Sequence, residues 1–286
     1  MDNTFYFTQD SFKDANITLE QFDYIVSSLS EQINEFYGIS GNTLKYCNDI
    51  FDTWRWNGQN VFELIWNPDT YFDNDLRSKL QIIIMEKASS DESPSKTIEF
   101  KDLPPSSSNC LLAEKKNNFI SDDHQITPQG LTWYEFCLKY IKRNPGSSDD
   151  FINNCEILFR NIVFLPNVRT SIKSIYNDFK NKILFHLDGL NKNIRRAKQS
   201  NDTETLKRLS TLSRFDEEAS LEGDHSSKRK KELTFDNTYC EPHIKLCRSD
   251  KYPGDSEYYK YRIYFNMNDI QGNKGKVIIG HIGKHQ

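Results

Sequence analysis

Long apolar runs are missing from this chain. No stretch approaches the roughly 18 consecutive apolar residues that a membrane-spanning helix needs, and only 36% of the residues are hydrophobic. The opening residues, MDNTFYFTQD, contain neither the basic segment nor the apolar segment of a secretory signal peptide. These absences argue against a membrane or secreted protein, and we expect a soluble protein with a cytoplasmic location.

Several chemical motifs are missing as well. The sequence contains no GxxxxGK[ST] or GxGxxG phosphate-binding motif and no GxSxG nucleophile motif. Its six cysteines include no CxxC pair. In a chain of this length without an export signal, such cysteines are typical of reduced thiols rather than of disulfides or zinc ligands. We therefore expect no metal and no cofactor.

Aromatic residues and a charge asymmetry are present instead. The 19 Phe and 14 Tyr can supply a core despite the polar average. Residues 151–286 hold 24 Lys and Arg against 17 Asp and Glu, whereas residues 1–150 hold 13 against 24. The sign of the charge changes near the turn-forming sequence NPGSSDD at 144–150. A length of 286 residues also favours two domains, and we place the boundary after residue 150.

The first half is expected to be an acidic, mainly helical N-terminal domain. Thr18 and Gln21 form a capping box before an apolar pattern of helical spacing that continues to Gly38. Residues 75–88 predict a second helix, and Thr132 begins a third. The Pro- and Ser-rich residues 89–109 are typical of a loop.

The second half is expected to be a basic α+β domain. Residues 155–165 indicate a strand, or an apolar helix leading into one. An amphipathic pattern from 168 to about 200 and a further helix at 202–213 predict a helical hairpin. A charged linker, which we expect to be mobile, follows. Three strands, expected at 241–247, 259–267 and 276–283, then form a small antiparallel sheet, with a hairpin loop between the last two.

Polar residues alternate along the first two of these strands. Side chains of a strand point to opposite faces in turn, so one face of the sheet is expected to carry Glu241, His243 and Lys245 from one strand and Lys260, Arg262 and Tyr264 from the next. A base, an acid and several cations are the groups that cleave a phosphodiester without a metal ion. The same residues would also suit an ordinary solvated sheet face.

The last strand adds two histidines. The sequence GHIGKHQ places His281 and His285 beside Lys284, and Gly280 and Gly283 indicate a bulge or a close backbone approach. Three histidines could also hold zinc, but residues four apart on a strand need not converge. We assign phosphate binding to Lys245 and Arg262, the general acid to His281 or His285, and the general base to Glu241 or His243. Lys260, Tyr264 and Lys284 are expected to bind substrate.

The order of a strand, a helical hairpin and three strands resembles the RelE/ParE superfamily of toxins. The likeness covers roughly residues 155–286 and includes the segments RIYF (262–265) and VIIGH (277–281). It implies an antiparallel sheet packed on the hairpin and, in many members, cleavage of RNA that is free or ribosome-associated. It also implies an antitoxin or other partner protein, which would bind the N-terminal domain. The hairpin is longer than in the family, and about 150 residues precede it.

Alternative functions remain open from the sequence. The same basic face would serve a non-catalytic module that binds nucleic acid or protein. Asp102 with Glu114-Lys115-Lys116 has the D…ExK spacing of metal-dependent nucleases. The tryptophans Trp54, Trp56 and Trp66 could form part of the core or a platform on which bases stack.

Overall fold

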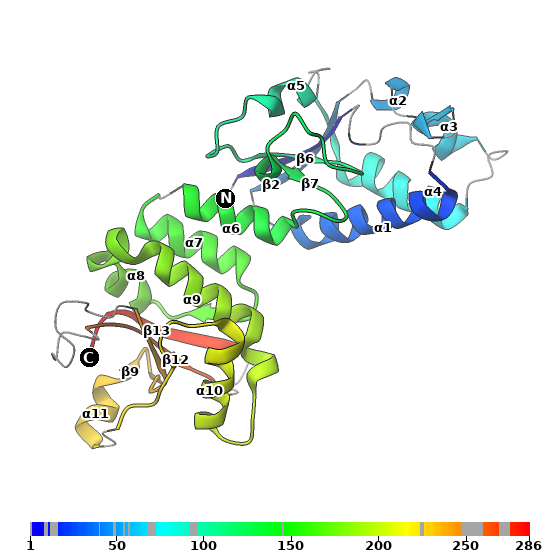
Figure 1. Ribbon diagram of the computed structural model, residues 1–286. Coiled ribbons are helices and arrows are strands. Elements are labelled where there is room, and N and C mark those ends of the chain that lie inside the picture. The colour runs from blue at the N-terminus through cyan, green and yellow to red at the C-terminus, as the bar shows by residue number, and fades with distance from the viewer. Residues whose placement is uncertain are drawn as a thin grey trace. The chain divides into compact units, whose positions relative to one another are not determined.

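The computed structural model divides into two compact units, Met1–Asn144 and Pro145–Gln286 (Figure 1). The structure describes residues 2–8, 11, 17–39, 41–47, 50–53, 55–56, 58–67, 73–91, 96–144, 146–223, 226–246, 260–268 and 275–286. The hairpin loop predicted between the last two strands lies largely outside these residues, as do Trp54 and Cys247. No helix within the described residues is long and apolar enough to cross a membrane.

A five-stranded sheet organises the first unit. Its strands are β1 (Asn3–Phe7), β2 (Asn42–Cys47), β5 (Ser89–Asp91), β6 (Asn109–Leu112) and β7 (Gln125–Ile126). They lie in the order β5-β2-β1-β6-β7, and each pair of neighbours is parallel. Counted along the chain, the strand order is 3-2-1-4-5. The chain therefore moves outward from β1 in one direction and then, from β6, in the other.

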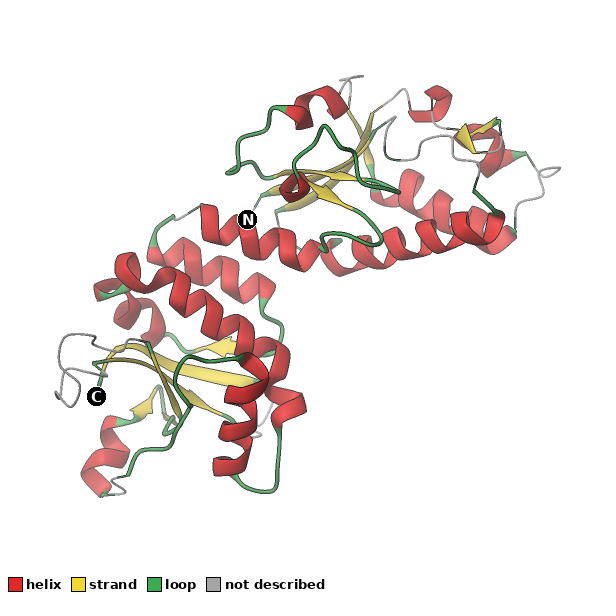
Figure 2. Ribbon diagram, in the orientation of Figure 1, coloured by secondary structure: helices red, strands yellow, loops and turns green. Residues whose placement is uncertain are grey.

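Helices cover both faces of this sheet (Figures 1 and 2). The longer ones are α1 (Leu19–Phe36), α4 (Asn74–Gln81), which continues as a π-helix at Ile82–Lys87, α5 (Lys96–Lys101) and α6 (Trp133–Arg143). Short elements complete the unit: α2 (Ile50–Thr53), α3 (Val61–Trp66), the hairpin of β3 (Arg55–Trp56) and β4 (Gln59–Asn60), and a 3-10 turn at Asp122–His124. Figure 1 shows α5 on one side of the sheet and α1 and α6 on the other.

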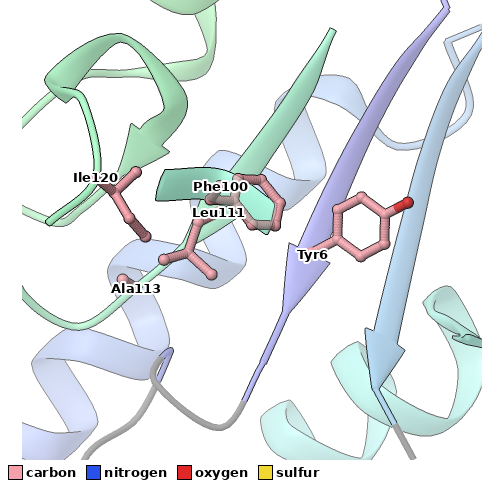
Figure 3. Packing of buried hydrophobic residues seen from close by; sticks show 5 residues of the cluster. All are labelled: Tyr6, Phe100, Leu111, Ala113 and Ile120. Atoms are coloured by element: carbon pink, nitrogen blue, oxygen red, sulfur yellow. The ribbon is translucent and has the colours of Figure 1, made fainter. Parts of the chain in front are cut away.

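The central strand β1 is buried on both faces. Phe5 stacks on Phe36 of α1, with ring centroids 4.0 Å apart, and meets Phe136 of α6 at 5.6 Å. Tyr6 points the other way, to Phe100 of α5 at 5.5 Å, in the cluster that Figure 3 shows. Strands of parallel sheets are commonly apolar on both faces for this reason.

The local predictions for the first unit are confirmed, but the organisation was not foreseen. Both capping boxes are present, at Thr18 and at Thr132, and Gly38 has a φ of +80°, as a glycine after a helix often does. The description as mainly helical is incomplete, because it omits the parallel sheet. Residues 89–109, predicted to be a loop, contain β5, α5 and the first residue of β6.

The second unit combines helices with a four-stranded sheet. Its helices are α7 (Ser148–Leu158), α8 (Asn167–Ser171), which continues as a 3-10 turn at Ile172–Ser174, α9 (Tyr176–Ala197), α10 (Asp202–Ser213) and α11 (Ser227–Glu232). Its strands are β8 (Ile162–Phe164), the hairpin of β9 (Thr234–Phe235) and β10 (Thr238–Tyr239), and β11 (His243–Lys245), β12 (Tyr261–Asn266) and β13 (Val277–Lys284). The predicted boundary after residue 150 falls inside α7.

The sheet has the order β11-β12-β13-β8. The helical hairpin and the three final strands are present as predicted, and residues 155–165 form the end of a helix and then a strand. The sheet is not purely antiparallel, because β8 runs parallel to β13. Strand pairing shifts register between Tyr264 and Phe265 opposite Gly280, which confirms the predicted bulge.

The segment predicted to be a mobile linker is folded onto the sheet. Leu233, Phe235 and Cys240 form a buried cluster with Tyr264 of β12. A Cβ atom at Gly280 would lie 2.7 Å from both Cys240 and Phe235, so only a glycine admits this close packing without a shift. Figure 1 places α7, α8 and α9 on one side of the sheet and α11 with β9 on the other. The polar face, expected to be open to solvent, is covered.

Candidate functional site

Strand pairing brings the predicted polar residues into two rows. His243 of β11 lies opposite Tyr264 of β12, which lies opposite His281 of β13. In the second row, Lys245 lies opposite Arg262, which lies opposite Gly283. The alternation predicted for these strands is therefore correct. The prediction that these side chains are exposed to solvent is wrong, since Tyr264 is fully buried and His243 is 3% exposed.

Glu222 occupies the centre of this face. Its Oε1 atom accepts hydrogen bonds from Arg262 and from the Tyr264 hydroxyl, the latter at 3.2 Å. The same oxygen lies 3.2 Å from Nη2 of Arg229 and 3.6 Å from Nε2 of His285. It also lies 3.5 Å from Nδ1 of His243. One carboxylate thus joins two guanidinium groups, a phenol and two imidazoles, and we call these six residues the Glu222 cluster.

Most of the Glu222 cluster is removed from solvent. The side chains of Arg229, Glu222 and Arg262 are 10, 12 and 13% exposed. His285 is the accessible member, with 41% of its side chain exposed. Arg229 also donates to the backbone carbonyl of Gln286 and lies 3.1 Å from Nε2 of His285, which ties the end of β13 to α11. The cluster therefore has one polar opening, at His285.

Burial and the two arginines determine the protonation of the cluster. Burial acts to raise the pKa of Glu222, but His243, Arg262 and Arg229 together hold it below its usual value. Burial, reinforced by Arg262, lowers the pKa of His243 to about 3. The pKa of His285 is lowered by the same two causes. At neutral pH the carboxylate is consequently ionised and both imidazoles are uncharged.

His281 is packed into the protein interior rather than exposed at the cluster. Its ring stacks on Phe235 at 5.2 Å, and it is 7% exposed. Its Nε2 atom lies 3.0 Å from the Lys284 carbonyl and from the Gln286 amide, and its Nδ1 atom lies 3.4 Å from Asn167. The contacts with Phe235 and Asn167 hold β13 to neighbouring elements, and those with Lys284 and Gln286 fix its end. Of the two histidines proposed as the general acid, His285 is therefore the more exposed.

Glu241 is likewise separate from the cluster. Its side chain accepts a hydrogen bond from Tyr239, and burial together with this bond raises the pKa of Tyr239 to about 12. The carboxylate beside Arg262 is Glu222, which the sequence analysis did not select. Glu222 and Arg229 both lie in the supposed linker, and no local pattern distinguishes them from the other charged residues there.

The predicted substrate-binding lysines surround the sheet rather than enter the cluster. Lys245 and Lys260 are half-buried, and Lys284 is exposed. Lys284 lies opposite Tyr261 at the end of β13, and the Lys260 carbonyl accepts a hydrogen bond from the His285 backbone at 2.6 Å. By strand alternation Lys260 shares a face with His285, whereas Lys284 shares the other face with Tyr261, and Lys245 lies on β11 opposite Arg262.

The alternatives raised by the sequence have less support from the geometry. Within the described residues, no group of three or more His, Cys, Asp and Glu side chains is arranged to hold a metal ion. Asp102 is exposed, whereas Glu114 is buried beside Lys115, with 3.7 Å between charged atoms. Trp56 is buried against Phe22 at 5.2 Å and belongs to the core, whereas Trp66 is 41% exposed. The five described cysteines are buried.

In comparisons with known proteins, no family model, no curated protein and no solved structure matches the chain.

Proposed function

We propose that the second unit is a RelE-like, metal-independent endoribonuclease of the kind found in toxins and defence effectors, acting on RNA in the cytoplasm. The observation that carries this proposal is the Glu222 cluster. It places an accessible imidazole and two arginines within 3.6 Å of one carboxylate oxygen. Each of these groups has a role in the cleavage of RNA.

The reaction would be an internal transfer of the phosphodiester. Ionised Glu222 takes the proton of a ribose 2′-hydroxyl, and the 2′-oxygen then forms a bond to phosphorus. The bond from phosphorus to the 5′-oxygen breaks, and that oxygen receives a proton from His285 after this otherwise uncharged imidazole has taken up a proton from solvent. Arg229 and Arg262 stabilise the additional negative charge on the phosphoryl oxygens. The products are a 2′,3′-cyclic phosphate and a 5′-hydroxyl, without a metal ion or a cofactor.

A second candidate is a non-catalytic module that binds nucleic acid or protein. The observation that favours it is the pairing of both arginines with Glu222 in a covered environment, where they are 10 and 13% exposed. In this case the cluster serves to hold the described part of residues 219–240, which is 219–223 and 226–240, on the sheet. Binding would then depend on the lysines at the sheet edge, through the release of counterions from a phosphate backbone.

Incubation of the purified full-length protein with total RNA and EDTA separates the two candidates. We expect cleavage that His285→Ala slows by about 10²-fold or more, since general acid catalysis contributes that much, with RNA affinity retained. Lys207→Gln, an exposed position on α10, is the matched control and should cleave normally. If the unaltered protein binds RNA but leaves it intact under these conditions, the binding module stands and the ribonuclease is rejected.

A further inference from the structure

The first unit contains a large cavity that the proposed function does not use. Its volume is about 1120 Å³. The wall consists of residues from the first turns of α1 and α6, the chain that follows β6, and the chain on either side of β7. All of these residues lie within a single unit.

The cavity lies at a characteristic place in a parallel sheet. The strand order 3-2-1-4-5 reverses direction between β1 and β6. In open α/β sheets, ligands bind outside the carboxyl ends of the strands at such a switch point. The cavity is lined after the carboxyl end of β6 by Glu114, Lys115 and Lys116. It is also lined by Ile17, which lies between β1 and α1. The Glu114 N–H donates to the Ser11 carbonyl at 2.6 Å, which links the chains that leave the two central strands.

One part of the wall suits an aromatic ring. Tyr24 lies there with 55% of its surface exposed, among the apolar side chains Ile17, Ile25, Pro128, Leu131 and Leu138. An exposed tyrosine among aliphatic residues provides a flat surface on which a base can stack. The volume of about 1120 Å³ lies slightly above the range of about 300–1,000 Å³ for pockets that enclose a drug-sized molecule, so a nucleotide has room.

The other part of the wall supplies cations. Lys115, Lys116 and Lys139 line it. Lys116 pairs with Asp122 at 2.7 Å, and Lys139 pairs with Asp123 at 2.6 Å. The lysine side chains of these pairs are 58 and 43% exposed. Exposed ion pairs contribute little free energy, so Lys116 can turn toward a ligand at small cost. Lys139 is held more firmly, because Asp123 is only 24% exposed and also pairs with Arg143.

We propose that this cavity is a nucleotide-binding site. The base lies on Tyr24 and its apolar neighbours, the phosphates contact the lysines after β6, and the Glu114 carboxylate accepts hydrogen bonds from the ribose hydroxyls. No glycine-rich loop takes part, so lysine side chains rather than backbone N–H groups hold the phosphates. This explains why the phosphate-binding motifs are missing from the sequence although the site is present.

Calorimetric titration of the full-length protein with ATP, ADP and AMP tests the proposal. Magnesium chloride is present throughout, because Glu20, Glu114, Asp122 and Glu135 also line the cavity and would repel an unneutralised polyphosphate. Adenosine, which lacks the phosphates, and inorganic triphosphate, which lacks the nucleoside, are titrated for comparison as the two partial ligands. We expect at least one nucleotide to bind more tightly than either partial ligand.

Three variants locate the binding. The double variant Lys115→Ala/Lys116→Ala should weaken nucleotide binding by about tenfold or more, because two charge-assisted contacts are lost. Tyr24→Ala should weaken it by about fivefold or more through lost stacking. Lys142→Ala, an exposed position of α6 outside the cavity wall, should bind as the unaltered protein does.

Two results would overturn the site. One is no heat of binding with any nucleotide at millimolar concentration. The other is equal affinity in the lysine double variant, in Tyr24→Ala and in Lys142→Ala. Unfolding curves followed by tryptophan fluorescence show that each variant is folded. Failure here leaves the ribonuclease proposal untouched, since that activity is assigned to the other unit.

Discussion

The two units differ in whether their polar residues are covered or exposed. In the second unit, charged and aromatic side chains that alternate along neighbouring strands meet on one sheet face, and residues 219–240 then cover that face and neutralise it through Glu222. In the first unit, the polar residues at the carboxyl edge of the sheet come from separate segments and line an open cavity. A dense polar pattern in the sequence therefore does not mark an accessible surface, whereas an open cavity forms where the sequence offers only the short ExK pattern of Glu114-Lys115-Lys116.

The comparison can be measured because the units carry different probes. All four tryptophans, Trp54, Trp56, Trp66 and Trp133, belong to the first unit. Tryptophan fluorescence therefore reports the unfolding of that unit alone. Hydrogen exchange at the backbone amides of β12 and β13 reports the second unit.

The largest effect is expected when Glu222 is removed. In Glu222→Ala, Arg229 and Arg262 remain mostly buried without their carboxylate, and breaking a buried ion pair in this way costs about 3–5 kcal/mol. Protection of the β12 and β13 amides should fall accordingly, while the tryptophan transition stays in place. Glu232→Ala is the control, since Glu232 is the more exposed partner of Arg229, at 41%, and should cost less than about 1 kcal/mol. Equal losses in the two variants would show that the cluster is not a buried network.

Acid should destabilise the second unit by the next largest amount. The pKa of His243 is lowered to about 3 and that of His186 to about 4, in both cases mainly by burial. In the unfolded chain both titrate near their ordinary value of 6.5, so between that pH and the folded value the unfolded state binds more protons. Stability is therefore greatest above pH 6.5 and declines as the pH falls. The expected loss at pH 5 is about 2 kcal/mol for each histidine.

His186→Phe provides the corresponding control. Neither ring nitrogen of His186 has a hydrogen-bond partner among the described residues, and the ring packs against Phe215 at 4.9 Å. The variant should fold and should lose part of the pH dependence, as measured by hydrogen exchange at pH 7 and pH 5. Unchanged stability of the unaltered second unit between these two pH values would contradict the assignment of buried, neutral histidines.

A smaller effect tests how closely residues 219–240 pack on the sheet. Gly280→Ala places a Cβ atom against Cys240 and Phe235, and overpacking of this kind costs about 1–3 kcal/mol. Gly223→Ala meets nothing within 4 Å and should change stability by only a few tenths of a kcal/mol. Thermal unfolding of the two variants, compared with hydrogen exchange at β13, measures the difference. If Gly280→Ala is as stable as Gly223→Ala, the cover is looser than the structure indicates.

The smallest effects are expected at two helix caps, one in each unit. Thr132 caps α6 of the first unit and Ser147 caps α7 of the second, each in a complete capping box. Either change to alanine should cost about 1 kcal/mol. Thr132→Ala should shift the tryptophan transition, and Ser147→Ala should affect only the exchange of the second unit. A shift of both signals by either variant would mean that the units unfold together.

The sequence by itself determined the elements whose signals are local. The helix after Thr18, the helix after Thr132, the α9–α10 hairpin and the three final strands were predictable, because capping and periodicity act over a few residues. The alternation that places His243, Arg262 and Tyr264 on one face was predictable for the same reason.

Only the tertiary structure decided what those elements form. The parallel sheet of the first unit consists of short strands, and β5 lies in a polar stretch that resembles a loop, so its existence depends on pairing with the distant strand β2. Glu222 is one acidic residue among many until residues 219–240 fold over the sheet and bring it to Arg262. Such contacts join positions far apart in the chain and depend on the burial of the whole unit, which no local pattern encodes.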